Sequence, residues 1–460
     1  MIYMEFKILS KTPIYKAFSR LGKRIFQPNG IFYWAGRAKK ESDLSGTVGT
    51  AMGLESEFVE NGRDEFLPFY LEQVKDYIKL PPEKFVAYAP MTGLPKLRSL
   101  WKDWVIYKAK KDGNMPSGSV NLSGKLTNPI ICNGITNAIF LTTRYFLDEG
   151  ESIISPEKRW GNYNSIITRQ NGITIESFKF FKDKEYNVEG MLKLMKQVAE
   201  KQGKVVLILN FPNNPTGYCP KPDEVKKITT SLTKFCEENS EVPVVVLCDD
   251  AYEGYVYTDE RVSQSIFNEL VNLHPYLIPL KLDGSSKEML MYGARVAAIT
   301  LGLHSAWYEN KEEKKILIEE WENKTKALIR STISNCSRYN QEVLVDILSN
   351  GLDKLIESRK KVFDILKARY DKTIKTFHDL NPPNLSLDPA GGGFFVFINV
   401  DGVKADTLAD HLLKKYKLGT IAIVDEEEGI NGLRVAYCSI PEEKVDECIS
   451  RIDKGIRDLI

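Results

Sequence analysis

Side chains that could do chemistry stand just beyond several apolar runs of this chain. Lys287 follows the run from Leu277 to Leu282 and a stretch of small residues, and its amine could form an imine with a carbonyl compound. Asp249 directly follows the run from Val244 to Cys248, where a carboxylate could hold a proton on a ligand. Taken singly, Lys287 could be one more surface lysine and Asp249 a helix N-cap, with Asp250 as its rival.

Other polar and aromatic residues follow the neighbouring runs. Asn214 lies in NFPNNPTG, Trp160 in WGN, and Gly134 in NGITN. Arg295 stands eight residues after Lys287. An Asn-Pro pair is commonly a turn, and a tryptophan is by default part of a core. It is the combination of these residues that indicates a site.

Seven short β-branched runs between about residues 130 and 302 alternate with helical patterns. Continuous apolar runs joined by helices predict a mainly parallel sheet covered on both faces. The runs are Pro129 to Cys132, Ser152 to Ile154, Ile173 to Ile175, Val205 to Leu209, Val244 to Cys248, Leu277 to Leu282 and Ala297 to Leu301, with helices such as Asn187 to Lys201 and Lys221 to Glu238 between them. Because ligands of such sheets bind beyond the carboxyl ends of the strands, we expect these polar residues to meet at one edge.

The pattern changes after residue 305. Long charged helical patterns lead into strands and helices at Glu309 to Lys326, Gln341 to Ile374, Phe394 to Ile398, Ala405 to Tyr416, Gly432 to Tyr437 and from Pro441 onward. This order predicts a smaller α+β unit. We predict a large domain over residues 65–325, a small domain over 326–460, and an N-terminal segment, 1–64, that completes the small domain.

Composition narrows the class of protein. With 63 basic and 62 acidic residues, the net charge of +1 gives no reason to expect nucleic acid or an anionic membrane as a partner. The seven cysteines form no C-x-x-C pair, and the four histidines show no metal-ligand spacing, so we expect neither metal nor disulfides. No apolar stretch of about 20 residues and no secretory signal is present, which favours a cytoplasmic enzyme.

The candidate residues suit one cofactor, pyridoxal 5′-phosphate (PLP). A PLP enzyme needs a lysine for the imine, an acid at the pyridine nitrogen, and donors to the ring oxygen and phosphate. The segment Gly134, Ile135 and Thr136, opening a helix, would bring backbone N–H groups to a phosphate. Arg295 would add a charged fork for its oxygens.

The ordered motifs WGN, NNPTGY, DDAY, SSK with an arginine eight residues on, and NGLRVAYCS resemble the class I and II aminotransferases of PLP fold type I, closest to the aspartate and aromatic enzymes. The match spans about residues 85 to 440. The resemblance implies an α/β fold, with a mainly parallel central sheet flanked by helices and a smaller α+β domain. It also implies that Lys287 is the Schiff-base lysine and moves the Cα proton, and that Asp249 pairs with the pyridinium nitrogen.

The resemblance assigns further residues around the cofactor and the substrate. Tyr252 and Asn214 would donate to the ring oxygen, Trp160 would cover the ring, and Ser285 would help to hold the phosphate. Tyr88 resembles a tyrosine that reaches the cofactor of the neighbouring subunit, which implies a homodimer with shared sites. Asn214 and Trp160 would also face the substrate.

Two arginines are assigned to the substrate by the same resemblance. Arg434 resembles the arginine that binds the substrate α-carboxylate. Arg330, in IRSTISN, resembles the arginine that binds a second carboxylate from the other subunit in aspartate aminotransferases.

Three departures from the family pattern stand out. Gly284 occupies a position where serine is usual, and Tyr163 replaces the histidine that supports the aspartate. The N-terminal substrate-lid motif is not recognisable between Gly30 and Glu57. The first two would tune the cofactor site, and the third leaves the side-chain pocket undefined.

The resulting hypothesis is ping-pong transamination between an L-amino acid, with a dicarboxylate such as aspartate favoured by Arg330, and a 2-oxo acid. The same cofactor site also serves a C–S lyase, a decarboxylase or a synthase. A PLP-binding regulator is a further alternative, although such proteins carry an added DNA-binding domain. The lysine, aspartate and carboxylate-binding arginine together favour an active enzyme.

Overall fold

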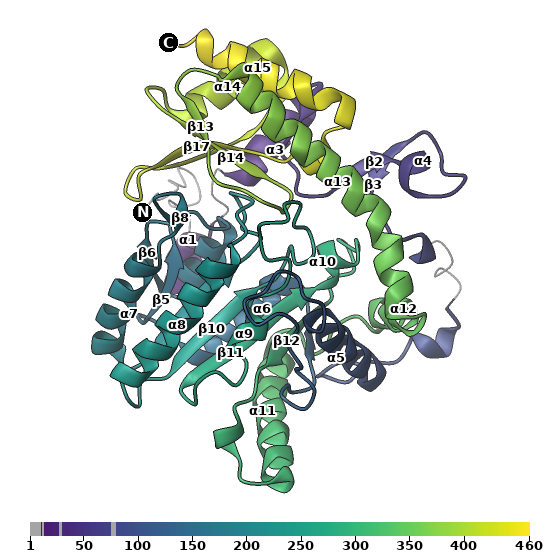
Figure 1. Ribbon diagram of the computed structural model, residues 1–460, viewed down its shortest axis with the longest axis vertical. Coiled ribbons are helices and arrows are strands. Elements are labelled where there is room, and N and C mark those ends of the chain that lie inside the picture. Colours follow the sequence, from purple (N-terminus) through teal and green to yellow (C-terminus); the bar gives the residue numbers. More distant parts are fainter. Residues whose placement is uncertain (1–10, 12, 27–29, 75–79) are drawn as a thin grey trace.

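A seven-stranded sheet forms the centre of the larger unit in the computed structural model, which describes residues 11, 13–26, 30–74 and 80–460 (Figure 1). The strand order is β4-β12-β11-β10-β9-β5-β6. The strands are β4 (Ile130–Cys132), β5 (Ser152–Pro156), β6 (Thr174–Phe178), β9 (Val205–Asn210), β10 (Val244–Asp249), β11 (Leu277–Gly284) and β12 (Ala297–Leu301). Only β12 runs antiparallel to its neighbours β11 and β4. The predicted mainly parallel sheet is confirmed.

Both faces of this sheet are covered, which explains why its strands are continuously apolar. Along β9, Val205 and Leu207 contribute to the core on one face, and Val206 and Ile208 to the core on the other. Helices α7 (Val188–Gln202) and α8 (Pro222–Glu238) cover the first face, and α6 (Gly134–Phe146) covers the second. A strand buried on both sides has no polar face, so periodicity of two disappears from its sequence.

A four-stranded antiparallel sheet forms the second unit, drawn in green to yellow at the top of Figure 1. Its order is β13-β14-β17-β16. The strands are β13 (Leu385–Leu387), β14 (Val396–Val400), β16 (Ile421–Asp425) and β17 (Ile430–Val435), and the helices packed with them are α13 (Leu352–Leu380), α14 (Ala405–Tyr416) and α15 (Val445–Arg457).

The N-terminal part joins this second unit. Helix α3 (Ile31–Glu41) packs against β15 (Leu418–Gly419) and β16, and β1 (Leu44–Ser45) pairs in parallel with β15. Two further strands, β2 (Met52–Leu54) and β3 (Phe66–Pro68), form a hairpin. The expected absence of a secretory signal concerns mainly residues 1–10, which lie outside the described residues.

One helical prediction was wrong. The pattern from Gln341 to Ile374 is not one helix, because α12 (Arg338–Ser349) ends before Asn350 and α13 begins at Leu352. Gly351, between them, has a φ of 103°, a conformation that favours glycine. The Asn-Gly pair is a turn signal that the longer apolar periodicity obscured.

The remaining elements are short or connect the units. They are α1 (Pro13–Ala17), α2 (Arg20–Arg24), α4 (Glu55–Phe58), α5 (Pro95–Ala109), α9 (Phe267–Leu270), α10 (Ser285–Glu288), α11 (Lys311–Thr332), and the paired strands β7 (Phe181–Lys182) and β8 (Glu185–Tyr186). Among the helices of the described ranges, none has the length and apolar character needed to cross a lipid bilayer.

Candidate active site

The carboxyl ends of β9 and β10 are tied together by one asparagine. Asn210, in register with Asp249, donates its side-chain amide to the Asp249 carbonyl at 2.8 Å. Its Oδ1 accepts the backbone N–H of Asn214 at 2.9 Å. With β11 parallel to β10 on the other side, the segments carrying Asn214, Tyr252 and Lys287 all leave the sheet at the same edge.

Lys287 lies in the short helix α10, directly after β11. Its Nζ is 5.1 Å from the centroid of the Tyr252 ring, and its backbone carbonyl accepts the Tyr255 hydroxyl at 2.9 Å. Burial lowers the pKa of Lys287 to about 8, although the nearby Asp249 carboxylate opposes part of this effect. About a tenth of the amine is therefore uncharged at pH 7, far more than for an ordinary lysine, and nucleophilic attack on a carbonyl requires this neutral form.

Asp249 is buried at the end of β10 and is held by two donors. The Tyr163 hydroxyl donates to its Oδ2, and the Ala251 backbone N–H donates to its Oδ1 at 3.2 Å. Burial raises the pKa of Asp249, whereas the hydrogen bond from Tyr163 lowers it. Tyr163 also packs edge-on against Trp160, with ring centroids 5.7 Å apart, so it supports two of the predicted site residues at once.

Tyr163 is a residue whose role sequence reasoning missed. The sequence indicated the loss of a histidine at this position, but it gave no sign that a phenol would still reach Asp249. The signal was its place in WGNY, immediately after the predicted ring-covering tryptophan.

The rival carboxylate, Asp250, points elsewhere. Its Oδ2 accepts Lys281 Nζ at 2.5 Å and the Ser265 hydroxyl at 2.7 Å. Adjacent residues at the end of a strand face opposite sides, and here only Asp249 faces Tyr163.

Gly134 and Arg295 meet at the N-terminus of α6. Gly134 has a φ of 78°, and a Cβ there would lie 2.2 Å from Arg295 Nη2, so the glycine makes room for the guanidinium. Ile135 and Thr136 follow in the first turn of α6, whose free N–H groups favour an anion. Arg295 Nη1 donates to Ser286 Oγ at 3.3 Å and to the Tyr292 carbonyl at 3.1 Å, which leaves Nε and Nη2 for other acceptors.

The small residues before Lys287 differ in what they can reach. Ser285 is buried and donates its hydroxyl to the Val296 carbonyl at 3.0 Å, whereas Ser286 lies beside Arg295. A Cβ at Gly284 would lie 3.1 Å from both Ile135 Cγ1 and the Ala297 Cβ. This close packing is a physical reason for glycine where the family usually has serine. Of the two serines, it is Ser286 whose hydroxyl accepts a hydrogen bond from Arg295.

Arg434, on β17, is a buried cation with no salt bridge to any described residue. Its side chain donates to Asn214 Oδ1 at 3.2 Å and to the Thr47 carbonyl at 2.9 Å, and its guanidinium lies 4.2 Å from the centroid of the Phe395 ring. Its Nε has no hydrogen-bond partner in the described structure. Burial lowers the pKa of Arg434. A buried charge left in this state is expensive unless an anion from outside the chain completes it.

Two predicted residues do not join the cluster within one chain. Tyr88 is 88% exposed in the loop before α5. Arg330 is exposed near the end of α11, where it donates to Ser334. Neither forms a hydrogen bond or ion pair with Lys287, Asp249 or Arg434.

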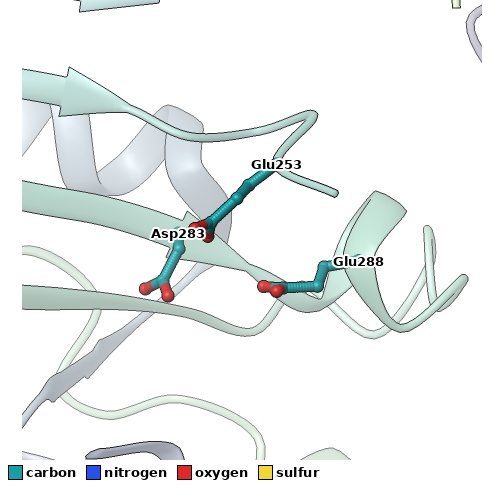
Figure 2. Close-up of side chains that lie close together, drawn as sticks. All are labelled: Glu253, Asp283 and Glu288. Carbon is teal, nitrogen blue, oxygen red and sulfur yellow. The ribbon is translucent and has the colours of Figure 1, made fainter. Parts of the chain in front are cut away.

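Behind the site, three buried carboxylates come together from three elements. Glu253, Asp283 and Glu288 lie in the turn after β10, in β11 and in α10, with oxygens within 4.8 Å of one another (Figure 2). The sequence gives no reason to expect this cluster. Glu253 is 30 residues from Asp283, and the three acids belong to no common motif.

Similarity to known proteins covers most of the chain. The family profile described as aminotransferase class I and II matches residues 64–452. The chain is 24% identical over 380 residues to a probable aspartate/prephenate aminotransferase of Aquifex aeolicus, covering 81% of this chain and 84% of that protein. It is 24% identical over 371 residues to the mitochondrial aspartate aminotransferase of Schizosaccharomyces pombe, covering 76% and 74% of the two chains.

Solved structures show the same fold. An aminotransferase of Anaerococcus prevotii matches with a TM-score of 0.77 at 23% identity, over 95% of this chain and 98% of that one. A kynurenine aminotransferase of Pyrococcus horikoshii, solved in complex with PMP, matches with a TM-score of 0.75 at 17% identity, over 97% and 98% of the two chains.

Proposed function

The chain belongs to the class I and II aminotransferase family, and we propose that its active site is the cluster of Lys287, Asp249 and Arg434. It is a PLP-dependent aminotransferase, as the sequence indicated. Arg434 carries the assignment of the site, because this buried guanidinium has no carboxylate partner among the described residues and is near enough to help lower the pKa of Lys287. An amino acid would bring the missing carboxylate to the arginine and its amine toward the lysine.

The side chains at this edge fit PLP. Gly134, the α6 N-terminus and Arg295 would hold the phosphate, and Asp249 would keep the pyridine nitrogen protonated. When bound, the cofactor supplies an electron sink for the carbon that loses its proton. The remaining candidates for its ring and ring oxygen are Asn214, Tyr252 and Trp160.

The chain's own residues would then orient the substrate and move one proton. Arg434 would fix the α-carboxylate, and the Phe395 ring on its face would restrict how the guanidinium can turn. The amine of Lys287, with a pKa of about 8, suits a base that would take the proton from the Cα of the amino donor and would give a proton to the Cα of the oxo acid in the second half-reaction. The overall reaction transfers the amino group from an L-amino acid to a 2-oxo acid in two half-reactions.

A dicarboxylic amino acid, aspartate or glutamate, is the proposed donor. Arg330 supports this choice, because an exposed guanidinium that pairs with no described carboxylate could bind a second substrate carboxylate. The relatives named for aspartate or for aspartate and prephenate support it as well.

A homodimer with shared sites would explain the positions of Tyr88 and Arg330. Phe85, Val86 and Tyr88 expose 38%, 71% and 88% of their surface within one loop. Exposed aromatic and aliphatic groups in one segment are typical of a surface that another chain covers. In the proposed dimer, Tyr88 and Arg330 of one subunit complete the site of the other.

The division of the chain and its compartment are also proposals. Packing of α3 and β1 on β15 and β16 supports the grouping of residues 1–64 with 326–460, around a large domain at 65–325. The seven cysteines are all buried and unpaired, which supports a reducing compartment such as the cytoplasm.

A half-reaction tests the function of the site. The cofactor-loaded protein is mixed with L-aspartate alone, and oxo acid, ammonia and carbon dioxide are quantified. We expect about one molecule of oxo acid per site, with neither ammonia nor carbon dioxide released. Arg434→Gln should abolish the oxo acid product, whereas Arg457→Gln, a substitution of an exposed arginine, should retain it as the control. Release of ammonia or carbon dioxide by the native protein would instead favour a lyase or a decarboxylase.

A substitution at Arg330 tests the donor. We expect Arg330→Ala to lower kcat/KM at least about tenfold more for aspartate than for alanine, since only aspartate presents a second carboxylate. The exposed Arg144→Ala serves as the control. Equal losses with both amino acids would refute the dicarboxylate proposal.

A further inference from the structure

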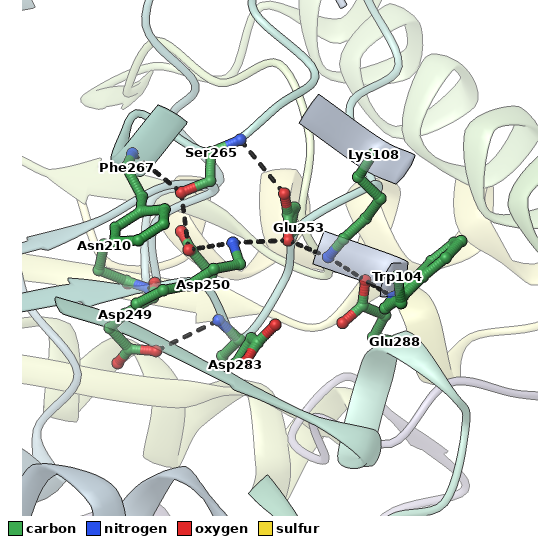
Figure 3. A network of polar contacts seen from close by, with 12 residues as sticks. Trp104, Lys108, Asn210, Asp249, Asp250, Glu253, Ser265, Phe267, Asp283 and Glu288 are labelled. Atoms are coloured by element: carbon green, nitrogen blue, oxygen red, sulfur yellow. Dashed lines mark hydrogen bonds and ion pairs between the residues drawn. The ribbon is translucent and has the colours of Figure 1, made fainter. Parts of the chain in front are cut away.

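A buried network of charges lies directly behind the proposed site. Each of three proposed site residues is followed in the sequence by an acid that belongs to this network, and Figure 3 shows the three acids. The pairs are Asp249-Asp250, Tyr252-Glu253 and Lys287-Glu288. Whatever fixes the three acids therefore also fixes the backbone that carries the three site residues.

Lys108, near the end of α5, joins two of these acids. Its ammonium contacts Glu253 Oε2 and lies 2.5 Å from Glu288 Oε1. Trp104, one turn earlier on the same helix, donates its indole N–H to Glu288 Oε1 at 2.9 Å. The side chain of Lys108 is 9% exposed and those of Glu253 and Glu288 are 3% and 1% exposed, so water competes little for these contacts.

Lys281, on β11, joins the third acid. Its Nζ lies 2.5 Å from Asp250 Oδ2 and 2.9 Å from Glu253 Oε2. Glu253 therefore accepts both ammonium groups and is the centre of the network. Burial alone would raise the pKa of Glu253, but Lys108 and Lys281 together lower it to about 2.

A metal ion is not needed to explain the acids in Figure 2. The ammonium of Lys108 already bridges Glu253 and Glu288, and a divalent cation between them would be repelled by it and by Lys281. Asp283, the third carboxyl, accepts the Trp101 indole N–H at 3.0 Å, and burial raises its pKa to about 6.

We propose that Lys108 is a positioning residue, whose ammonium ties the turn carrying Tyr252 to the helix carrying Lys287 and so sets the phenol and the amine relative to each other. The proposal rests on the proposed function, in which Tyr252 and Lys287 act on the cofactor. Lys108 belongs to neither turn, and the amine and the Tyr252 ring are 5.1 Å apart with no direct hydrogen bond between them. The link through Glu253 and Glu288 joins the two turns through charged side chains, in addition to the bond from the Tyr255 hydroxyl to the Lys287 carbonyl.

The test separates positioning from mere stability. Lys108→Met leaves the buried Glu288 without an ammonium partner and Glu253 with that of Lys281 alone, and is expected to unfold easily. The double variant Lys108→Met/Glu288→Gln removes one charge of each sign, and its amide oxygen can still accept from Trp104. Lys102→Met, on the same helix, is the matched control, because Lys102 bonds to the Leu126 carbonyl outside the network.

We expect the double variant to fold and to attach the cofactor covalently at Lys287. Its kcat should fall at least about tenfold with less than about a threefold change in KM, because a misplaced proton-transfer group affects the chemical step more than binding. The pH midpoint of covalent cofactor uptake by the apo protein should also shift. Lys108→Arg, which retains a bridging cation, should recover most of the kcat.

Retention of kcat and of the pH midpoint in the folded double variant would overturn the positioning role. If the double variant does not fold, Glu288→Gln decides the question by the same kcat and pH readouts, with Lys108→Arg as the control that keeps the bridge. An unchanged kcat and pH midpoint in Glu288→Gln would overturn the positioning role. Failure of the native protein to attach the cofactor at Lys287 would refute the proposed function instead.

Discussion

Two buried positive charges near the carboxyl edge of the sheet are treated in opposite ways. Arg434 has no carboxylate partner among the described residues, and one of its nitrogens lacks any hydrogen bond. Lys281, at similar depth, has two carboxylates within 2.9 Å. Both are almost fully buried, so desolvation penalises both.

The difference separates binding from architecture. A buried cation that is fully paired in the chain has nothing left for a ligand, and its removal harms the fold. The desolvation cost of an unpaired buried cation is offset by other interactions in the fold, and a ligand anion that pairs with this cation binds more tightly. Removing the charge should therefore harm activity in one region and stability in the other.

The largest expected effect is on catalysis at Arg434. Arg434→Gln should lower kcat/KM for amino acids about 10³-fold, since two charge-assisted hydrogen bonds to the α-carboxylate are lost. The free energy of unfolding should stay within about 1 kcal/mol of the native value, because the charge removed was unpaired. Steady-state kinetics and urea unfolding measure the two. A large loss of stability with little loss of kcat/KM would erase the contrast.

The counterpart is Lys281→Met, which should destabilise the fold by about 3 kcal/mol near neutral pH, because Asp250 and Glu253 lose their shared ammonium. Urea unfolding at several pH values is the measurement. The penalty should shrink in acid, where the abandoned carboxyls take up protons. A pH-independent loss would mean that packing rather than charge holds this region together.

Tyr163→Phe should act between these extremes. It removes a donor to Asp249, so the pKa of that carboxyl should rise further and kcat should fall about tenfold. Tyr186→Phe is the matched control, since the buried Tyr186 hydroxyl has no hydrogen-bond partner in the described structure. Comparable kcat values for the two variants would show that the Tyr163 hydroxyl does not support catalysis through Asp249.

The smallest effect is a pH dependence without any substitution. Burial lowers the pKa of Lys287 from 10.5 to about 8, so its reactive neutral form grows with pH and levels off above about 8. Covalent uptake of PLP by the apo protein should follow that curve. Between pH 8 and 10.5, Lys287 is protonated in the unfolded chain but mostly neutral in the folded protein. Its contribution therefore makes the free energy of unfolding increase as the pH rises through this range. Uptake that keeps rising past about pH 9.5 would indicate an ordinary lysine.

The strands of the large sheet and the residues that follow them were predictable, because the local pattern of apolar residues determines both. Seven apolar runs gave seven strands, and the residues just past them meet at one edge because the carboxyl ends of parallel strands do. The break at Gly351 was missed because apolar periodicity continues on both sides of it.

Contacts between distant segments were not predictable. Lys108 is one of 63 basic residues, and nothing in its surroundings on α5 indicates that it meets Glu253 and Glu288. The bond from Tyr163 to Asp249 depends in the same way on how β5 and β10 are placed in the sheet. Tyr88 and Arg330 depend on a second chain and stay predictions.

The most direct measurement is the site at which the protein holds its cofactor. The loaded protein is reduced with borohydride, digested, and the modified peptide is identified by mass spectrometry. The account predicts one modified residue, Lys287, and no modification in Lys287→Ala, whereas Lys193→Ala, an exposed-lysine control, should be labelled like the native protein. Modification of another lysine in the native protein, or retention of the label in Lys287→Ala, would contradict it.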